Sequence, residues 1–212
     1  MNCKYILFDL DGTLTDPKEG ITRCVQYSLR SFGIEEDTEN LTPFIGPPLA
    51  QMFESSYGID GAAATAKYRE RYATVGIFEN RVYDGIAQML VKLKAAEKML
   101  ALATSKPEVF ARRILEKYEL SQYFDVTVGS ELDGRRTDKA EVIAEALRQL
   151  GNPDKGDAKM VGDRSHDVIG AKKCGIKCIG VRFGFAEQGE LEKAGADYIA
   201  GSVSELSDML LK

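Results

Sequence analysis

Hydrophobic and polar residues follow two different patterns along this chain. Short unbroken apolar runs, such as Ile6-Leu7-Phe8, are typical of strands that are buried on both faces of a parallel sheet. Longer stretches with apolar residues three or four positions apart are typical of helices that bury one face. The order of the two patterns along the chain therefore predicts which segments form a sheet and which form only helices.

Residues 18–80 show only the helical pattern of apolar residues. Apolar residues recur at helical spacing over 21–32, and Gly33 follows as a C-terminal stop. The sequence Gly46-Pro47-Pro48 interrupts the pattern and suits the start of a second helix. A third helix is expected over about 60–75. The pattern predicts a small all-helical module inserted after the first strand.

Strands and helices alternate from about residue 84 to the end. Helices are expected at 85–96, 107–117, 138–150, 165–174, 187–194 and 203–211, and strands at 99–104, 124–128, 158–162, 177–181 and near Tyr198. Such alternation predicts a parallel sheet covered by helices on both faces, with right-handed crossovers. We therefore expect an α/β fold with a Rossmann-like core of residues 1–16 and 81–212 and a helical domain of residues 17–80.

Acidic residues follow two of the expected strands at the point where each strand ends. Asp9 and Asp11 come directly after the first strand, Asp163 follows the strand at 158–162, and Asp167 lies in the next helical turn. Ligands of open α/β sheets bind beyond the carboxyl ends of the strands. Carboxylates placed so close together need a counter-cation or a shared proton. Carboxylates with water suit Mg²⁺, so we expect Asp9, Asp11 and Asp163 to meet at a magnesium ion.

Groups that suit phosphate binding follow another strand. Thr104 and Ser105 come just before an expected helix, whose N-terminus offers free N–H groups to an anion. Lys139 begins a further expected helix and would add a point positive charge, with Lys106 as the alternative lysine. Together with the acidic residues, these groups predict phosphoryl-transfer chemistry.

The composition argues against several other classes of protein. A net charge of −5 argues against a general nucleic-acid binder, and no apolar stretch is long enough to span a membrane. We expect no signal peptide at the start of the chain, and its four cysteines are scattered, so we also expect a cytoplasmic protein. One histidine, His166, cannot supply a multi-histidine zinc site, which leaves acid–base work to carboxylates. The oligomeric state stays open between monomer and homodimer.

The chemistry-bearing residues form a familiar set. The segments Asp9-Leu-Asp-Gly-Thr-Leu, Thr104, Lys139 and Gly162-Asp163-x3-Asp167 resemble, in order, the four motifs of the haloacid dehalogenase (HAD) superfamily. The helical insert resembles the C1 cap of that superfamily. Within it, the chain is most similar to the phosphoglycolate phosphatase branch, which also contains 5′-nucleotidases and pyrophosphatases. The segments Phe44-Ile-Gly-Pro-Pro-Leu and Gly129-Ser-x-Leu-Asp-Gly add to this similarity.

The resemblance implies a role for each acidic residue. Asp9 would be the nucleophile that forms an aspartyl-phosphate. Asp11 would protonate the leaving oxygen, help to activate water, and give its backbone carbonyl to Mg²⁺. Asp163 would bind the ion directly, and Asp167 would lie beside it or behind it. The implied function is a magnesium-dependent phosphatase acting on a small phosphorylated metabolite such as phosphoglycolate or a nucleoside monophosphate.

The resemblance also implies how the phosphoryl group is held. Thr104 and the backbone N–H of Ser105 would bind its oxygens, and Lys139 would neutralise its charge. The family often has asparagine at the position of Ser105 and Pro-x-Pro after the lysine, where this chain has Ala140-Glu141. These departures weaken a narrow subfamily assignment and leave the chemistry unchanged. Candidates for substrate specificity are Thr15, Asp16, Gly46 and Arg71.

Several other functions are compatible with these residues. A phosphomutase similar to β-phosphoglucomutase would use the same core but return the phosphoryl group to a sugar. A phosphorylation-controlled receiver module shares the acid, hydroxyl and lysine, but it is shorter and lacks the insert at 18–80. A non-catalytic phosphate-binding descendant would keep the motifs without turnover. A dehalogenase is disfavoured because Asp11 supplies acid catalysis that suits a phosphoester.

Overall fold

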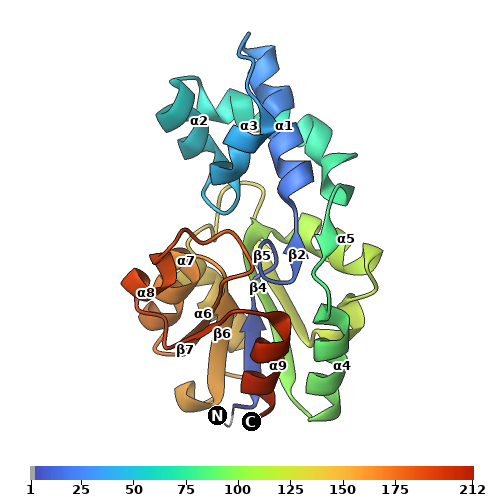
Figure 1. The fold of residues 1–212 in the computed structure, drawn as a ribbon, viewed down its shortest axis with the longest axis vertical. Coiled ribbons are helices and arrows are strands. Elements are labelled where there is room, and N and C mark those ends of the chain that lie inside the picture. Colours follow the sequence, from blue (N-terminus) through green and yellow to red (C-terminus); the bar gives the residue numbers. More distant parts are fainter. Residues whose placement is uncertain (1–2) are drawn as a thin grey trace. The chain divides into compact units, whose positions relative to one another are not determined.

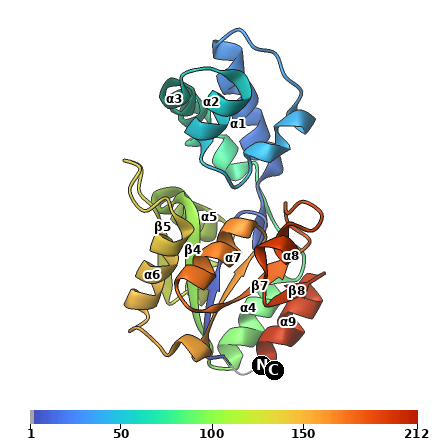
Figure 2. The ribbon, with the colours of Figure 1, turned by 90° about the vertical axis from the view of Figure 1, so that its left-hand side faces the viewer.

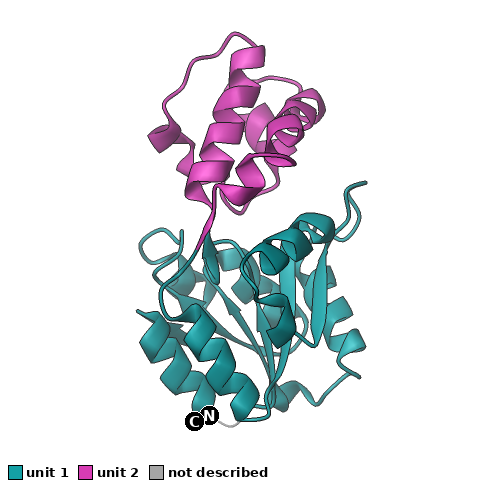
Figure 3. Cartoon of the chain, turned by 90° about the vertical axis from the view of Figure 1, so that its right-hand side faces the viewer, with its two compact units in different colours: residues 1–16, 82–212 teal, residues 17–81 magenta. Residues whose placement is uncertain are grey.

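The structure is a computed structural model that describes residues 3–212. The chain divides into two compact units. Pro17–Arg81 forms one of them, here called the helical unit, and the segments before and after it form the other, here called the core unit (Figure 3). The structure thus places the second boundary after residue 81, where the sequence placed it after residue 80.

The core unit is built on a six-stranded sheet with the order β5-β4-β1-β6-β7-β8. The strands are β1 (Tyr5–Phe8), β4 (Met99–Pro107), β5 (Val126–Ser130), β6 (Ala158–Gly162), β7 (Lys177–Val181) and β8 (Tyr198–Ala200). All neighbouring strands pair in parallel. The expected α/β fold with a parallel sheet is therefore confirmed.

Helices cover both faces of this sheet (Figures 1 and 2). They are α4 (Ile86–Ala95), α5 (Glu108–Lys117), α6 (Lys139–Gln149), α7 (Ser165–Lys173), α8 (Glu190–Ala194) and α9 (Val203–Leu211). On one face, Val142 of α6 and Val168 of α7 pack with Leu7, Ala101 and Met160 of the strands. Helices α4 and α9 pack together at the other face. The apolar runs of the strands are buried because both faces are covered.

The order of the strands reverses at β1. Strand β4 pairs with one side of β1 and β6 pairs with the other, so that Phe8 is level with both Leu102 and Val161. The backbone N–H of Asp9 donates to the carbonyl of Val161 at 2.9 Å, which brings the end of β1 beside the end of β6. Such a switch in strand order is where open α/β sheets bind ligands.

The helical unit packs its helices around a small core of its own. It contains α1 (Lys18–Ser31), α2 (Leu49–Tyr57), α3 (Gly61–Tyr72) and the short 3-10 segments Thr38–Phe44 and Gly76–Phe78. Phe53 and Tyr68 are buried, and the hydroxyl of Ser28 on α1 donates to the carbonyl of Ala64 on α3 at 2.7 Å. Asp60 caps α3 by accepting from two backbone N–H groups. The chain enters and leaves this unit through β2 (Thr15–Asp16) and β3 (Arg81–Val82), which pair with each other.

Several element boundaries differ from the sequence-based expectation. Strand β4 continues past residue 104 to Pro107, because the strand bends and then pairs again with β5 at Ser130. Strand β5 begins at Val126 rather than 124, after the 3-10 turn Ser121–Tyr123. Helix α3 ends at Tyr72 rather than 75. Among residues 3–212, none of the helices combines the length and the apolar character that crossing a bilayer requires.

The start of α8 also differs from the expectation, by three residues. The apolar pattern predicts a helix from residue 187, whereas α8 begins at Glu190. Gly189 has a φ of +78°, a left-handed conformation that interrupts a helix. The carboxylate of Glu190 also accepts from the backbone N–H of Glu187 at 3.0 Å, which holds the preceding residues in a turn.

Candidate active site

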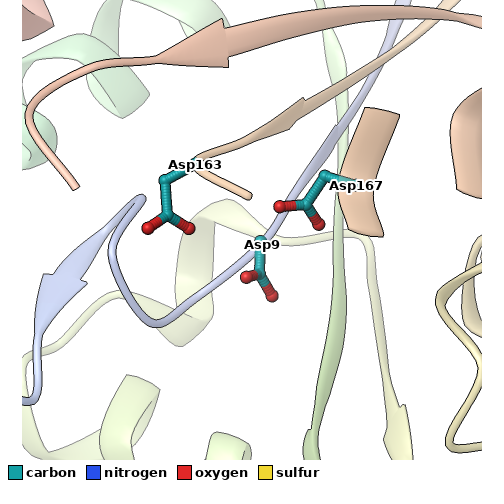
Figure 4. A group of neighbouring side chains, drawn as sticks. All are labelled: Asp9, Asp163 and Asp167. Atoms are coloured by element: carbon teal, nitrogen blue, oxygen red, sulfur yellow. The ribbon is translucent and has the colours of Figure 1, made fainter. Parts of the chain in front are cut away.

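Three acidic side chains gather where β1 and β6 end. Asp9 follows β1, Asp163 follows β6, and Asp167 lies in the first turn of α7 (Figure 4). One carboxylate oxygen from each residue lies within 4.8 Å of those of the other two. The structure thus brings together residues that are more than a hundred positions apart in the sequence.

The loop after β1 and the loop after β7 both come close to Asp163, and this close approach depends on two glycines. Gly12 has a φ of +80°, and a Cβ atom there would lie 2.0 Å from Oδ2 of Asp163. A Cβ atom on Gly184 would lie 2.2 Å from the carbonyl oxygen of Gly12. Neither position has room for a side chain. The loop after β1, Asp163 and the loop after β7 therefore interlock through backbone that only glycine permits.

Lys139 neutralises two of the three carboxylates. Its Nζ atom lies 2.8 Å from Oδ1 of Asp9 and 2.9 Å from Oδ1 of Asp167, and it donates to the carbonyl of Ala103 at 3.2 Å. Only 5% of the lysine side chain is exposed. Burial acts to lower the pKa of Lys139, but Asp167 and Asp9 outweigh it and raise the pKa above its usual value. The lysine is therefore a fixed positive charge in this cluster.

Asp11 has a different cationic partner. Its Oδ2 atom lies 2.5 Å from Nζ of Lys106, and both side chains are largely buried. Burial raises the pKa of the Asp11 carboxyl, and Lys106 acts in the opposite direction. The sequence left Lys106 as a rival to Lys139, whereas the structure pairs Lys106 with Asp11 and Lys139 with Asp9 and Asp167. The Asp11 side chain is not one of the three gathered carboxylates, and its expected contribution to the ion is its backbone carbonyl.

The two residues expected to bind phosphate lie on the strand next to β1. Thr104 is buried on β4, and its hydroxyl oxygen accepts from the backbone N–H of Lys106 at 3.2 Å. Ser105 is partly buried, and its carbonyl accepts from the hydroxyl of Ser130 at 2.7 Å. Both residues continue β4 instead of preceding a helix directly, because α5 begins only at Glu108.

The electrostatics of the acidic group fit a hard divalent cation. Burial raises the pKa of Asp163 well above its usual value, and the nearby charges of Asp167 and Asp9 add to the effect. The Oδ1 atom of Asp163 is buried and has no hydrogen-bond partner among residues 3–212. Oxygen ligands of this kind are those that Mg²⁺ prefers. The residues present therefore fit the magnesium ion that the sequence predicts.

Two of the four specificity candidates belong to the core unit and two to the helical unit. Thr15 is buried, and its hydroxyl lies 3.5 Å from the carbonyl of Leu10, while Asp16 is the second residue of β2. Gly46 is exposed in the helical unit. Arg71 belongs to the same unit and binds Glu79 through two nitrogens, at 2.6 and 2.8 Å. Their roles in specificity stay predictions.

The sequence reasoning missed one segment that contacts the site. The backbone N–H of Phe185 donates to Oδ2 of Asp163 at 2.7 Å. Glu190 accepts from Arg164 and from the backbone N–H of Ser165, which lie between Asp163 and Asp167. Residues 182–186 have no periodic pattern and no recognisable motif, and the pattern of residues 187–194 predicts only a helix. Glu190 is one of several acidic residues near a helix start, and nothing in the sequence distinguishes it.

Comparison with known proteins places the chain in a family. The model of the haloacid dehalogenase-like hydrolase family matches residues 6–181. The chain belongs to this family. A 5′-nucleotidase from Pseudomonas aeruginosa is 46% identical over 97% of this chain and 94% of its own length. The tyrosine-protein kinase PtkA of Mycobacterium tuberculosis is 37% identical over 98% of this chain and 72% of its own length.

A solved structure supports the same assignment. The crystal structure of a protein described as a predicted phosphatase from Clostridium acetobutylicum has a TM-score of 0.94 and 48% identity, covering 99% of this chain and 98% of its own. Together with the family match, this makes the chain a HAD-family phosphatase that acts on phosphorylated substrates. The family expected from the sequence motifs is confirmed.

Proposed function

We propose that this chain is a magnesium-dependent phosphatase that hydrolyses a small phosphorylated metabolite through an aspartyl-phosphate on Asp9. The observation that carries the proposal is the position of Lys139, which bridges Asp9 and Asp167 within the acidic group. A nucleophilic carboxylate with a fixed positive charge beside it can approach a phosphate dianion without prohibitive repulsion.

Magnesium would be held by Asp9, Asp163 and the backbone carbonyl of Asp11, with Asp167 next to them. The bound ion would neutralise charge on the phosphoryl group during transfer. Lys139 would offset the remaining charge of Asp9 and of the substrate. The hydroxyl of Thr104 and the N–H of Ser105 would orient the phosphoryl oxygens.

The reaction would proceed in two displacements. A carboxylate oxygen of Asp9 attacks phosphorus, the bond to the leaving oxygen breaks, and Asp11 gives its proton to that oxygen. Asp11 then takes a proton from water as the water oxygen attacks phosphorus. The acyl-phosphate bond breaks, inorganic phosphate leaves and Asp9 is regenerated. Lys106, in contact with Asp11 at 2.5 Å, would hold the acid–base carboxyl in one orientation throughout.

A nucleoside monophosphate is the first substrate class to test, and phosphoglycolate is the second. The 46% identity to a 5′-nucleotidase supports the first, and the motif resemblance supports both. The helical unit would supply selectivity for the organic part of the substrate. Thr15, Asp16, Gly46 and Arg71 are the residues proposed for that role, with Arg71 the weakest candidate because Glu79 occupies its guanidinium.

A panel of phosphorylated metabolites tests this function directly. Phosphate release is measured for each compound, with Mg²⁺ and with a chelator, for the natural chain and for Asp9→Asn. We expect release that depends on both the metal and Asp9. Release of phosphate without isomerised sugar phosphate would exclude a phosphomutase. Cation-independent release by the Asp9→Asn variant would contradict the proposal.

One relative is named as a tyrosine-protein kinase, so a tyrosine hydroxyl should be tested beside water as an acceptor of the phosphoryl group. The chain is incubated with labelled ATP and a tyrosine-containing peptide, and label on the peptide is compared with free phosphate. We expect the label in phosphate, because the proposed second displacement uses water. Label on the peptide would show that another hydroxyl can replace water.

A further inference from the structure

The carboxylate of Glu190 connects two loops at the candidate active site. Its Oε1 atom accepts from the backbone N–H of Ser165 at 2.7 Å and from Nε of Arg164 at 3.0 Å. Its Oε2 atom accepts from the backbone N–H of Glu187 at 3.0 Å. The side chain is largely buried, with 14% of its area exposed. One side chain thus fixes the start of α7 and the loop that precedes α8.

Both of these segments control the orientation of the acidic group. Arg164 and Ser165 lie between Asp163 and Asp167 in the chain, and the backbone N–H of Arg164 donates to Oδ2 of Asp167 at 3.1 Å. In the second segment, the backbone N–H of Phe185 donates to Oδ2 of Asp163 at 2.7 Å. Each of the two carboxylates is therefore oriented by a segment that Glu190 holds.

We propose that Glu190 is a positioning residue for the cation site: by tying the 163–167 segment to the 185–190 loop, it sets the affinity of Asp163 and Asp167 for a divalent cation. The inference rests on the proposed function, because it requires a cation at these carboxylates. Glu190 lies outside the acidic group and beyond residues 6–181, which the family model matches.

The charge of Glu190 is suited to this role. Burial acts to raise its pKa, but the hydrogen bonds from Ser165, Glu187 and Arg164 outweigh it and lower the pKa to about 2. Glu190 therefore accepts these hydrogen bonds as a carboxylate at neutral pH. Hydrogen bonds to an ionised acceptor are stronger than those between neutral groups. Residues that orient metal ligands in this way commonly change metal affinity or activity by about 10–100-fold when they are replaced.

The test compares Glu190→Gln with the matched control Glu192→Gln in the full chain. Glu192 lies on the same helix, and its carboxylate pairs with Arg182 at the surface. Mn²⁺ binding without substrate is measured by electron paramagnetic resonance, and phosphate release is measured over a range of Mg²⁺ concentrations. We expect Glu190→Gln to bind Mn²⁺ about 10–100-fold more weakly and to need correspondingly more Mg²⁺. At saturating Mg²⁺ its kcat should recover to within about threefold of the natural chain, because no reacting group has changed.

The outcomes separate this inference from the proposed function. Glu192→Gln should bind Mn²⁺ like the natural chain, and Glu190→Asp should fall between the natural chain and Glu190→Gln. Unchanged Mn²⁺ affinity in Glu190→Gln would overturn the role of Glu190 and leave the proposed function intact. A natural chain that neither binds Mn²⁺ nor needs Mg²⁺ would overturn the metal-dependent function itself. If Glu190→Gln does not fold, Arg164→Gln removes one of the same hydrogen bonds, and unchanged affinity there overturns the inference.

Discussion

The core unit and the helical unit use charged residues in different ways. In the core, Lys139 and Lys106 are buried against the carboxylates of Asp9, Asp167 and Asp11. In the helical unit, Arg71 pairs with Glu79 while about a fifth of each side chain stays exposed, with 22% and 18% of their areas accessible. The pairs of the core unit remove ionised groups from water, whereas the pair of the helical unit stays in partial contact with water.

The difference indicates which charges serve chemistry. Burying a charged group is unfavourable unless partners compensate for the lost hydration, and even a well-paired buried ion pair is weak support for stability. A partly exposed pair carries a smaller desolvation cost and can add modestly to stability. The buried charges of the core are therefore better explained by the reaction, and those of the helical unit by packing.

The largest expected effect comes from Asp9→Asn. Removing the proposed nucleophile should lower turnover by at least about a thousandfold, because the covalent step cannot begin. Unfolding in urea should remain cooperative. Phosphate release under saturating substrate and Mg²⁺ measures the effect, and Asp208→Asn serves as a control at an exposed carboxylate on α9. Substantial Mg²⁺-dependent turnover in Asp9→Asn would show that another residue is the nucleophile.

Lys139→Met tests the buried charges as a group. Without the lysine, Asp9 and Asp167 lose a shared positive partner, and breaking a buried ion pair typically costs about 3–5 kcal/mol. We expect a loss of that size in the free energy of unfolding, measured by urea denaturation in metal-free buffer. Lys173→Met is the matched control, because Lys173 is exposed and pairs with Asp138 on the surface. Equal losses in the two variants would contradict the contrast between buried and exposed pairs.

Arg71→Met gives the corresponding measurement in the helical unit. Its ion pair with Glu79 is partly exposed, so the free energy of unfolding should fall by only about 1 kcal/mol. If packing is its role, kcat and KM should stay within about twofold of the natural values. A rise in KM of more than about tenfold with unchanged stability would instead support the specificity role that the sequence predicts.

The pH dependence of stability should have opposite signs in the two units. Hydrogen bonds from Arg71 chiefly lower the pKa of Glu79 in the folded protein. Its stabilising effect is therefore present above the usual glutamate pKa of about 4.3 and is lost as the pH falls through the lowered value. Burial raises the pKa of Asp163, so its ionised form destabilises the metal-free fold above that raised value. That destabilisation is relieved as the pH falls toward the usual aspartate pKa.

Urea unfolding of metal-free Glu79→Gln and Asp163→Asn between pH 4 and 8 measures these signs. At pH 8, we expect Glu79→Gln to be less stable than the natural chain by about 1 kcal/mol or less, and Asp163→Asn to be more stable. The second difference should shrink as the pH falls. If both variants changed the free energy of unfolding in the same direction at pH 8, the distinction between the two units would be lost.

Much of the core was predictable because its signals are local. Buried parallel strands leave unbroken apolar runs, and these located β1, β6 and β7. A residue that follows such a run must lie at one edge of the sheet, which is why Asp9 and Asp163 could be expected to meet. The pairing of the two lysines with their carboxylates was less accessible. Lys106 follows an expected strand and Lys139 begins an expected helix, and the sequence does not give the directions of their side chains.

The rest depends on contacts that leave no periodic trace. Glu190 reaches Ser165 across 25 positions of sequence, and the helical pattern expected from residue 187 does not reveal this contact. In the helical unit, apolar spacing shows that helices form but does not reveal that Arg71 is held by Glu79. Long-range polar contacts of this kind are fixed by the completed fold.

The interlocked glycines constrain how such a protein can change over time. Because Gly12 and Gly184 approach each other and Asp163 within contact distance, three loops from distant parts of the chain share one small volume. A residue inserted into any of them would displace the other two, so new lengths and new side chains there would have to arise together. The insert between residues 17 and 81 folds around its own core and can be remodelled piece by piece. Changes of sequence and length are therefore easier to accommodate in that insert than in the three loops around Asp163.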